Sequence, residues 1–147
     1  MCNVLYLASD QPLPVVPWDP NIRGFHAVLP EAREEVVAKH FSKRHVRYLG
    51  SHLQCGCGFF YPDRNPDGSI EPDELEEWEE VRKTREGLVG YLRTTIQQAG
   101  PVEVVLSWSG EEARPVTRVP DLTPDAFLEE VFPLRDNQLV VVNAGRP

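Results

Sequence analysis

The sequence contains no apolar stretch approaching the roughly 18–20 residues that cross a membrane, and its start does not place a basic region before an apolar one. Basic residues are in deficit, since 15 lysines and arginines face 23 acidic residues, for a net charge of −8. A phosphate backbone is bound by a basic surface, so this balance argues against a nucleic-acid partner. We therefore expect a soluble cytoplasmic protein without a membrane or nucleic-acid partner, and leave open a protein partner or a homo-oligomer.

Cysteine is also scarce. The chain has three, an odd number, and two of them are separated by a single residue, which is not the pattern of a secreted disulfide framework. Glycine motifs that bind phosphates or dinucleotides are missing, and the serines of residues 107–110 lack the preceding glycine of a hydrolase nucleophile elbow. The sequence therefore indicates no catalytic residue and favours a protein that is not an enzyme.

What is present suits one domain over residues 1–147, with 41% hydrophobic residues to form its core. Apolar runs predict strands at residues 2–8, 46–49, 102–108 and 139–142, with 24–29 and 115–119 as short additional candidates. Helices are expected after Pro30, from Asp73 until Gly100, and from Thr123 to Val131. In the second helix, apolar residues recur every three or four positions, with one skip at Arg85.

This alternation of strands and helices predicts an α/β or α+β fold. We expect a mixed sheet of four to five strands packed with two to three helices. The order of the strands in the sheet does not follow from the pattern.

The negative charge is concentrated in residues 63–86, which hold ten acidic and four basic residues. Residues 63–74 fill every specified position of the calcium-loop pattern D-x-[DN]-x-[DN]-G-x5-E. Gly68 stands where such a loop turns sharply. The predicted ligands are the side chains of Asp63, Asn65, Asp67, Glu71 and Glu74, and the backbone carbonyl of Ser69. The sequence thus predicts an EF-hand-like calcium site, without an entering helix or a second hand.

Two other interpretations of this region stay open. Residues 65–68, Asn-Pro-Asp-Gly, also fit a type I turn, after which the acidic residues would complement the positive end of the following helix. The acidic helix could instead be a solvated surface that binds a basic protein partner, which would make the chain an interaction module.

A second candidate site is formed by Cys55 and Cys57, with His52 nearby in the sequence. Two thiols one residue apart can bind a soft metal ion or close a strained, easily reduced disulfide. In the second case Cys55 and Cys57 would act as a redox dithiol, with His52 nearby to lower a thiol pKa. His52 and Cys2 would complete a tetrahedral zinc set. The remaining interpretation is structural, with two small thiols packed in a glycine-rich turn.

Whether Cys2 can join this site depends on how the predicted strands at residues 2–8 and 46–49 pair. If they were parallel, Cys2 and Cys55 would lie at opposite ends, on the order of 20 Å apart at about 3.3 Å per residue. An antiparallel pairing would bring them together. The sequence leaves this choice open.

The opening segment CNVLYLASDQPLPVVPWD and the segment HVRYLGSHLQCGCGFFY resemble a group of small uncharacterised bacterial proteins. The resemblance implies a bacterial cytoplasmic setting and draws attention to Cys55 and Cys57. It implies no activity, cofactor or catalytic residue, and it does not include the acidic loop.

Overall fold

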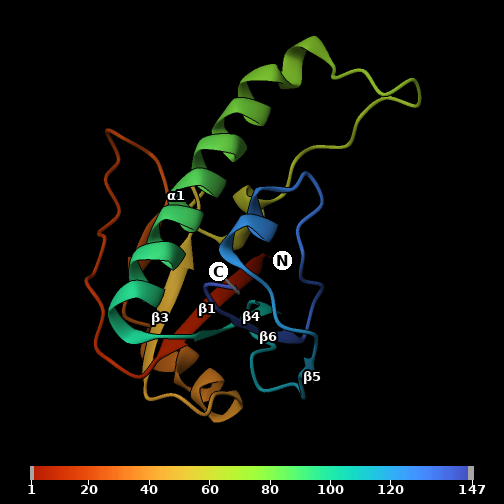
Figure 1. Ribbon diagram of the computed structural model, residues 1–147. Coiled ribbons are helices and arrows are strands. Elements are labelled where there is room, and N and C mark those ends of the chain that lie inside the picture. The colour runs from red at the N-terminus through yellow and green to blue at the C-terminus, as the bar shows by residue number, and fades with distance from the viewer. Residues whose placement is uncertain (1, 146–147) are drawn as a thin grey trace.

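The computed structural model describes residues 2–145 and contains one six-stranded mixed sheet, one α-helix and four short 3-10 helices (Figure 1). The strand order is β2-β3-β1-β4-β6-β5, and all neighbours are antiparallel except β5 and β6. The strands are β1 (Asn3–Ser9), β2 (His26–Val28), β3 (His45–Gly50), β4 (Val102–Trp108), β5 (Thr117–Arg118) and β6 (Gln138–Val142). The helices are η1 (Ala32–His40), η2 (Gly56–Phe59), η3 (Pro72–Glu74), α1 (Leu75–Ala99) and η4 (Pro124–Leu128).

The predicted fold class is confirmed, with differences in detail. Both short candidates, at residues 24–29 and 115–119, form strands, so the sheet has six strands rather than four or five. The first and last predicted helices are present as the 3-10 helices η1 and η4, and η4 ends at Leu128 instead of Val131. Neither has the length and continuous apolar face that stabilise an α-helix.

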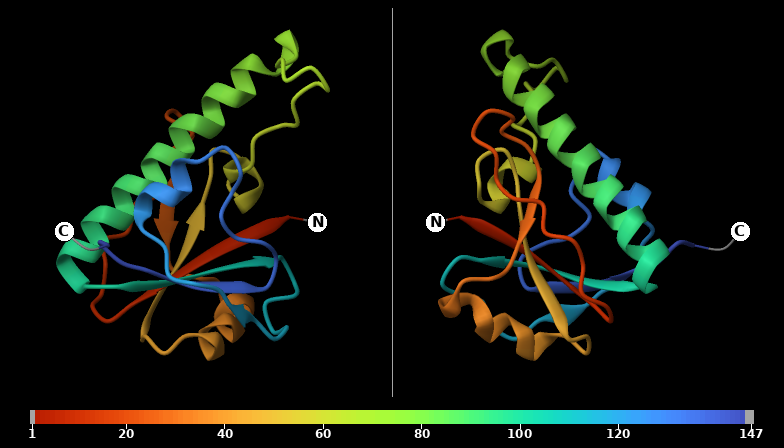
Figure 2. Two further views of the ribbon diagram at one scale, coloured as in Figure 1. Left: turned by 45° about the vertical axis from the view of Figure 1, so that its right-hand side comes forward. Right: turned by 90° about the vertical axis from the view of Figure 1, so that its left-hand side faces the viewer.

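The sheet is covered on both faces, by α1 on one and by η1 on the other (Figure 2). Successive side chains of a strand point to opposite faces, so the two faces of the sheet carry separate apolar clusters. In β1, Leu5 and Leu7 pack towards α1, whereas Val4 and Tyr6 belong to the cluster around Val37 of η1. The predicted central strands are thus buried on both sides.

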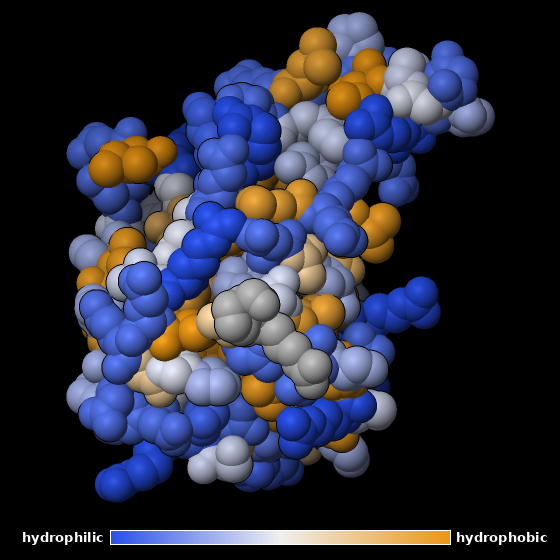
Figure 3. Space-filling model, in the orientation of Figure 1, coloured by the Kyte–Doolittle hydropathy of each residue, from blue (hydrophilic) through white to orange (hydrophobic). Residues whose placement is uncertain are grey.

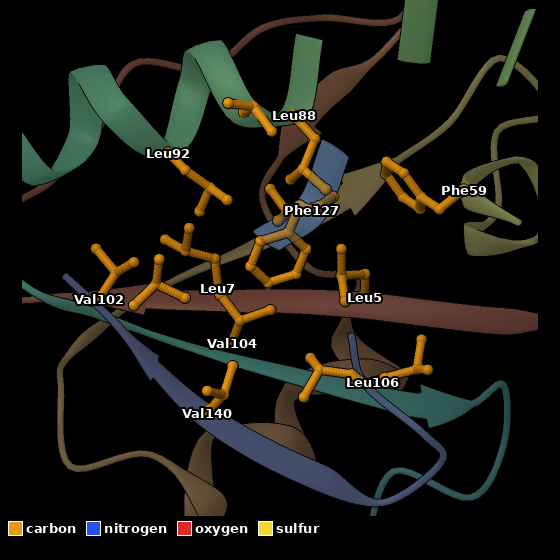
Figure 4. Packing of buried hydrophobic residues seen from close by; sticks show 14 of the residues in the cluster. Leu5, Leu7, Phe59, Leu88, Leu92, Val102, Val104, Leu106, Phe127 and Val140 are labelled. Carbon is orange, nitrogen blue, oxygen red and sulfur yellow. The ribbon is translucent and has the colours of Figure 1, made fainter. Parts of the chain in front are cut away.

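The larger cluster lies between the sheet and α1. Leu88 and Leu92 of α1 point at the sheet, and Phe127 of η4 fills the space beside them (Figure 4). The helix ends as predicted at Gly100, whose positive φ of 78° suits a residue without a Cβ, while its N–H bonds to the Ile96 carbonyl. The buried residues of α1 are Val81, Thr84, Arg85, Leu88, Val89, Leu92 and Thr95.

The first turns of α1 extend beyond the sheet, and the loop of residues 63–71 projects beside them (Figure 1). On the face shown in Figure 3, apolar residues form small separate patches among hydrophilic ones. Across residues 2–145, no helix has both the length and the apolar character to span a membrane.

Candidate metal centre

The antiparallel pairing of β1 and β3 brings Cys2 to Cys55 and Cys57. In this register Leu5 faces Leu49, so the start of β1 lies next to the end of β3 and the segment that follows it. The 3-10 helix η2 lies over this end of β1 (Figure 2). As a result, the three Sγ atoms lie within 4.8 Å of one another.

The backbone around the thiols is held by Ser51. Its hydroxyl donates a hydrogen bond to the Cys55 carbonyl and accepts from the N–H groups of Leu53 and Gly58, and its own N–H also donates to Cys55 O. Because one side chain serves three backbone groups, residues 51–58 form a compact loop with little freedom.

The two glycines of CGCG allow the close packing that places the sulfur atoms. A Cβ on Gly56 would lie 2.8 Å from the Asn3 carbonyl oxygen, and one on Gly58 would lie 2.2 Å from the Ser51 hydroxyl. Any larger residue would push the loop away from β1 or from Ser51. The glycines therefore set the distance between Cys2 and the other two cysteines.

The surroundings of Cys55 disfavour its thiolate form. Burial is the main cause that raises the pKa of Cys55 to about 12. A backbone hydrogen bond from Cys57 lowers this pKa, whereas the thiols of Cys57 and Cys2 raise it. Tyr48 lies close by, and burial together with Glu34 and the three cysteines raises the pKa of its phenol. Cys2 is exposed, whereas Cys55 and Cys57 are partly buried. Thiolates this close together would repel one another, and a cation bound between the sulfur atoms would neutralise their charge.

His52 does not join the thiols. Its Nδ1 lies 3.0 Å from Thr84 Oγ1 and its Nε2 lies 3.0 Å from Glu77 Oε1, so both ring nitrogens face α1. The side chain is buried there and anchors the loop of residues 51–55 to the helix. Of the four residues considered for this site, Cys2, Cys55 and Cys57 come together, and His52 lies apart from them.

Three neighbouring thiols allow two kinds of chemistry. They can bind a soft metal ion as thiolates, or two of them can form a disulfide. All three carry free thiols in this structure. Among residues 2–145, they are the one group of three or more His, Cys, Asp or Glu residues whose ligand atoms converge in this way.

The acidic loop is an exposed, hydrogen-bonded turn. Asn65 N–H donates to the Ser69 carbonyl, and Gly68 N–H donates to the Asn65 carbonyl, both at 2.8 Å. Asp67 Oδ1 accepts from the N–H and the hydroxyl of Ser69, and these bonds lower the pKa of Asp67. Gly68 has a φ of 86°, as the sharp turn of the pattern requires.

The predicted calcium ligands are spread along this loop. Asp63, Asp67 and Glu71 are exposed, and no three carboxylates of the loop converge within 4.8 Å in the described part of the chain. Glu74 Oε2 is buried without a hydrogen-bond partner. Calcium binding would require the loop to close around the ion, and it stays a prediction.

Arg64 connects the acidic loop to the segment after η4 and to α1. It pairs with Glu130, donates to the Gly68 carbonyl, and lies 4.6 Å from the ring centroid of Trp78. Trp78 is half-buried and stacks on Tyr61. The loop is therefore held at its base even though its tip is exposed.

Sequence reasoning gave no role to Ser51, and it placed Gly56 and Gly58 in a glycine-rich turn without naming what they contact. The glycine-rich spacing of CGCG was the available signal, because glycines flanking a possible ligand indicate a close backbone approach. The contact partners of these residues come from β1 and from the end of β3, so only the pairing of the strands reveals them.

No family model matches the chain, and no curated protein or solved structure is significantly similar to it. The resemblance of the N-terminal and CGCG segments to small bacterial proteins stays a prediction. Function is therefore inferred from the residues and their geometry.

Proposed function

We propose that this protein binds a soft metal ion through the thiolates of Cys2, Cys55 and Cys57. The observation that carries the proposal is the convergence of three Sγ atoms, from two distant parts of the sequence, within 4.8 Å. Thiolates are the ligands that select zinc and monovalent copper among biological metals. Gly56 and Gly58, which pack closely on Asn3 and Ser51, hold the thiols in place in the absence of metal. This lowers the entropic cost of ordering the ligands when a metal binds.

Metal binding also suits the site better than dithiol exchange. A reactive redox cysteine needs a low pKa, because the thiolate is the nucleophile. Here the pKa of Cys55 is raised to about 12, and His52, which would have lowered it, faces α1. A metal ion displaces the thiol protons and needs no positively charged side chain.

The test is metal binding by the fully reduced protein. Titration with Zn²⁺ and with Cd²⁺ should end at one ion per chain, and Cd²⁺ should produce thiolate-to-metal absorption in the ultraviolet. Cys55→Ser should lose this absorption and most of the affinity. The matched control is His52→Gln, which keeps hydrogen-bonding groups towards Thr84 and Glu77 and should retain one ion per chain.

Two results would contradict the proposal. One is a reduced, folded protein that binds neither ion. The other is a His52→Gln variant that loses the ion as completely as Cys55→Ser does, since that would place the ligands elsewhere.

A second proposal concerns residues 63–74, where we retain the prediction of calcium binding. The observation in its favour is Glu74 Oε2, a buried carboxylate oxygen without a hydrogen-bond partner at the position that supplies the bidentate ligand. Burying such an oxygen is costly unless a donor or a cation compensates it. Calcium would order the loop and the start of α1.

Thermal melting of metal-stripped protein tests this second proposal. Millimolar calcium should raise the melting temperature more than magnesium does, because a ligand bound only by the native state stabilises it. Glu74→Gln should abolish the shift, and Glu76→Gln, an equal charge change just beyond the loop, should keep it. An equal response to both ions would leave residues 63–74 as an ordinary acidic turn.

A further inference from the structure

We infer that the thiolate site is three-coordinate and takes monovalent copper in preference to zinc. This inference rests on the proposed thiolate site and specifies its metal. The reason is the number of ligands, because Cys2, Cys55 and Cys57 converge without any fourth His, Cys, Asp or Glu among residues 2–145. Structural zinc is held by four protein ligands in a tetrahedron, whereas monovalent copper is satisfied by three thiolates in a plane.

The neighbouring polar groups are already engaged. His52 directs both ring nitrogens to Thr84 and Glu77, and the Ser51 hydroxyl makes three hydrogen bonds to its own loop. The Tyr48 hydroxyl donates to the Gln54 carbonyl at 2.8 Å, so it too is engaged in a hydrogen bond. Zinc would have to complete its tetrahedron with water or an outside ligand.

The position of Cys2 gives the ion a route in and out. Cys2 is exposed, whereas Cys55 and Cys57 are partly buried within the loop of residues 51–58. Loading one Cu⁺ ion onto three thiols forms three copper–sulfur bonds and releases up to three protons, with no change in oxidation state. Exchange would begin at the exposed sulfur, where the thiol of a carrier or small molecule can reach the metal.

The experiment compares the two metals on the intact, reduced protein without oxygen. Cu⁺, kept monovalent by ascorbate and buffered by bicinchoninate, is titrated against protein preloaded with Zn²⁺, and X-ray absorption then counts the sulfur neighbours. We expect Cu⁺ to displace Zn²⁺ at one ion per chain and to show three sulfur neighbours. Cys2→Ser should leave two and weaken Cu⁺ binding by more than the roughly 10–100-fold that outer partners contribute.

The outcomes separate this inference from the proposed function. Retention of Zn²⁺ against buffered Cu⁺, or copper with two sulfur neighbours in the unmutated protein, would overturn the inference and leave thiolate binding standing. Failure to bind any of the probe metals would overturn both. Because Cys2 is exposed and precedes β1, the metal-free Cys2→Ser variant should keep its melting temperature. This control shows that weaker metal binding by the variant does not come from unfolding.

Discussion

Arg85 is the residue at which the helical pattern of the sequence breaks, and it is one of the largest buried side chains of the protein. No carboxylate pairs with it among the residues that the structure describes. Its guanidinium instead donates to the backbone carbonyls of Phe59, Phe127, Glu129 and Glu130. Burial lowers its pKa to about 10, so the group keeps its charge at neutral pH. Arg85 thus joins α1 to the end of η2 and to the segment after η4.

Replacing Arg85 with Met should destabilise the protein by roughly 3 kcal/mol or more, because the variant leaves two buried and two partly buried carbonyl oxygens without their donor. Urea unfolding followed by circular dichroism measures the change. The control is Arg82→Met on the same helix, whose pairs with Glu79 and Glu86 are exposed and whose loss should cost under about 1 kcal/mol. Equal losses in both variants would show that the buried carbonyls find other partners.

The cysteines show what single residues could and could not reveal. The CxC spacing pointed to Cys55 and Cys57, and the structure adds Cys2 to them. Whether Cys2 lies near Cys55 was undecided in the sequence, because the distance between them depends on the direction in which β1 and β3 pair. Neither strand determines that direction by itself. His52 was assigned by proximity in the sequence, yet its ring points to α1, where Thr84 and Glu77 offer hydrogen bonds.

At the scale of elements, the strongly patterned segments were predictable. The apolar run at Val102–Trp108 and the three- and four-residue spacing along α1 each match the observed element closely. The segment after Pro30 was harder. Its acidic start and its proline indicate a helix, but only Glu34 and Val37 are buried, so little apolar burial stabilises an α-helix there over the 3-10 form.

Two glycines of α1 provide a matched test of helix packing. Gly90 is exposed, and a Cβ added to it would meet nothing within 4 Å, whereas a Cβ on Gly87 would lie 2.7 Å from Phe25 Cβ. Gly90→Ala should therefore stabilise the protein by roughly 0.5–1 kcal/mol, the usual gain of alanine over glycine in a helix. Gly87→Ala should destabilise it, since Phe25 packs on the core and cannot easily move.

Chemical unfolding of the two variants measures this difference. A stabilising Gly87→Ala would mean that the segment around Phe25 moves freely away from α1. A destabilising Gly90→Ala would contradict the open surroundings of that position.

At the scale of the whole molecule, the acidic stretch and the thiols lie in two regions of different character, which His52 connects through its contacts with Glu77 and Thr84. The acidic stretch of residues 63–86 lies on the loop and the projecting turns of α1, where water and nearby arginines surround the carboxylates. The thiols lie where the start of β1 meets the segment after β3. The charge distribution and the spacing of Cys55 and Cys57 were visible in the sequence. The meeting of Cys2 with these two cysteines depends on the pairing of β1 with β3, which was not.

The buried face around β2 makes global stability depend on pH. His26 is 4% exposed, packs against Trp18 at a centroid distance of 5.2 Å, and has its pKa lowered by burial. The native state thus favours the neutral ring, whereas the unfolded chain takes up a proton below about pH 6.5. More protons bind to the unfolded state in that range, so the free energy of unfolding falls as the pH falls.

We therefore expect the free energy of unfolding to decrease as the pH is lowered from 7.5 to 5.5. The contribution of His26 to this decrease cannot exceed about 1.4 kcal/mol per pH unit. Urea unfolding of the unmutated protein and of His26→Gln at both values isolates this contribution. The variant loses packing against Trp18 at every pH, but its stability should fall less on acidification, and this smaller change is the decisive quantity. If both proteins lost equal stability, His26 would take up its proton in the folded state as readily as in the unfolded chain, and burial against Trp18 would not favour the neutral ring.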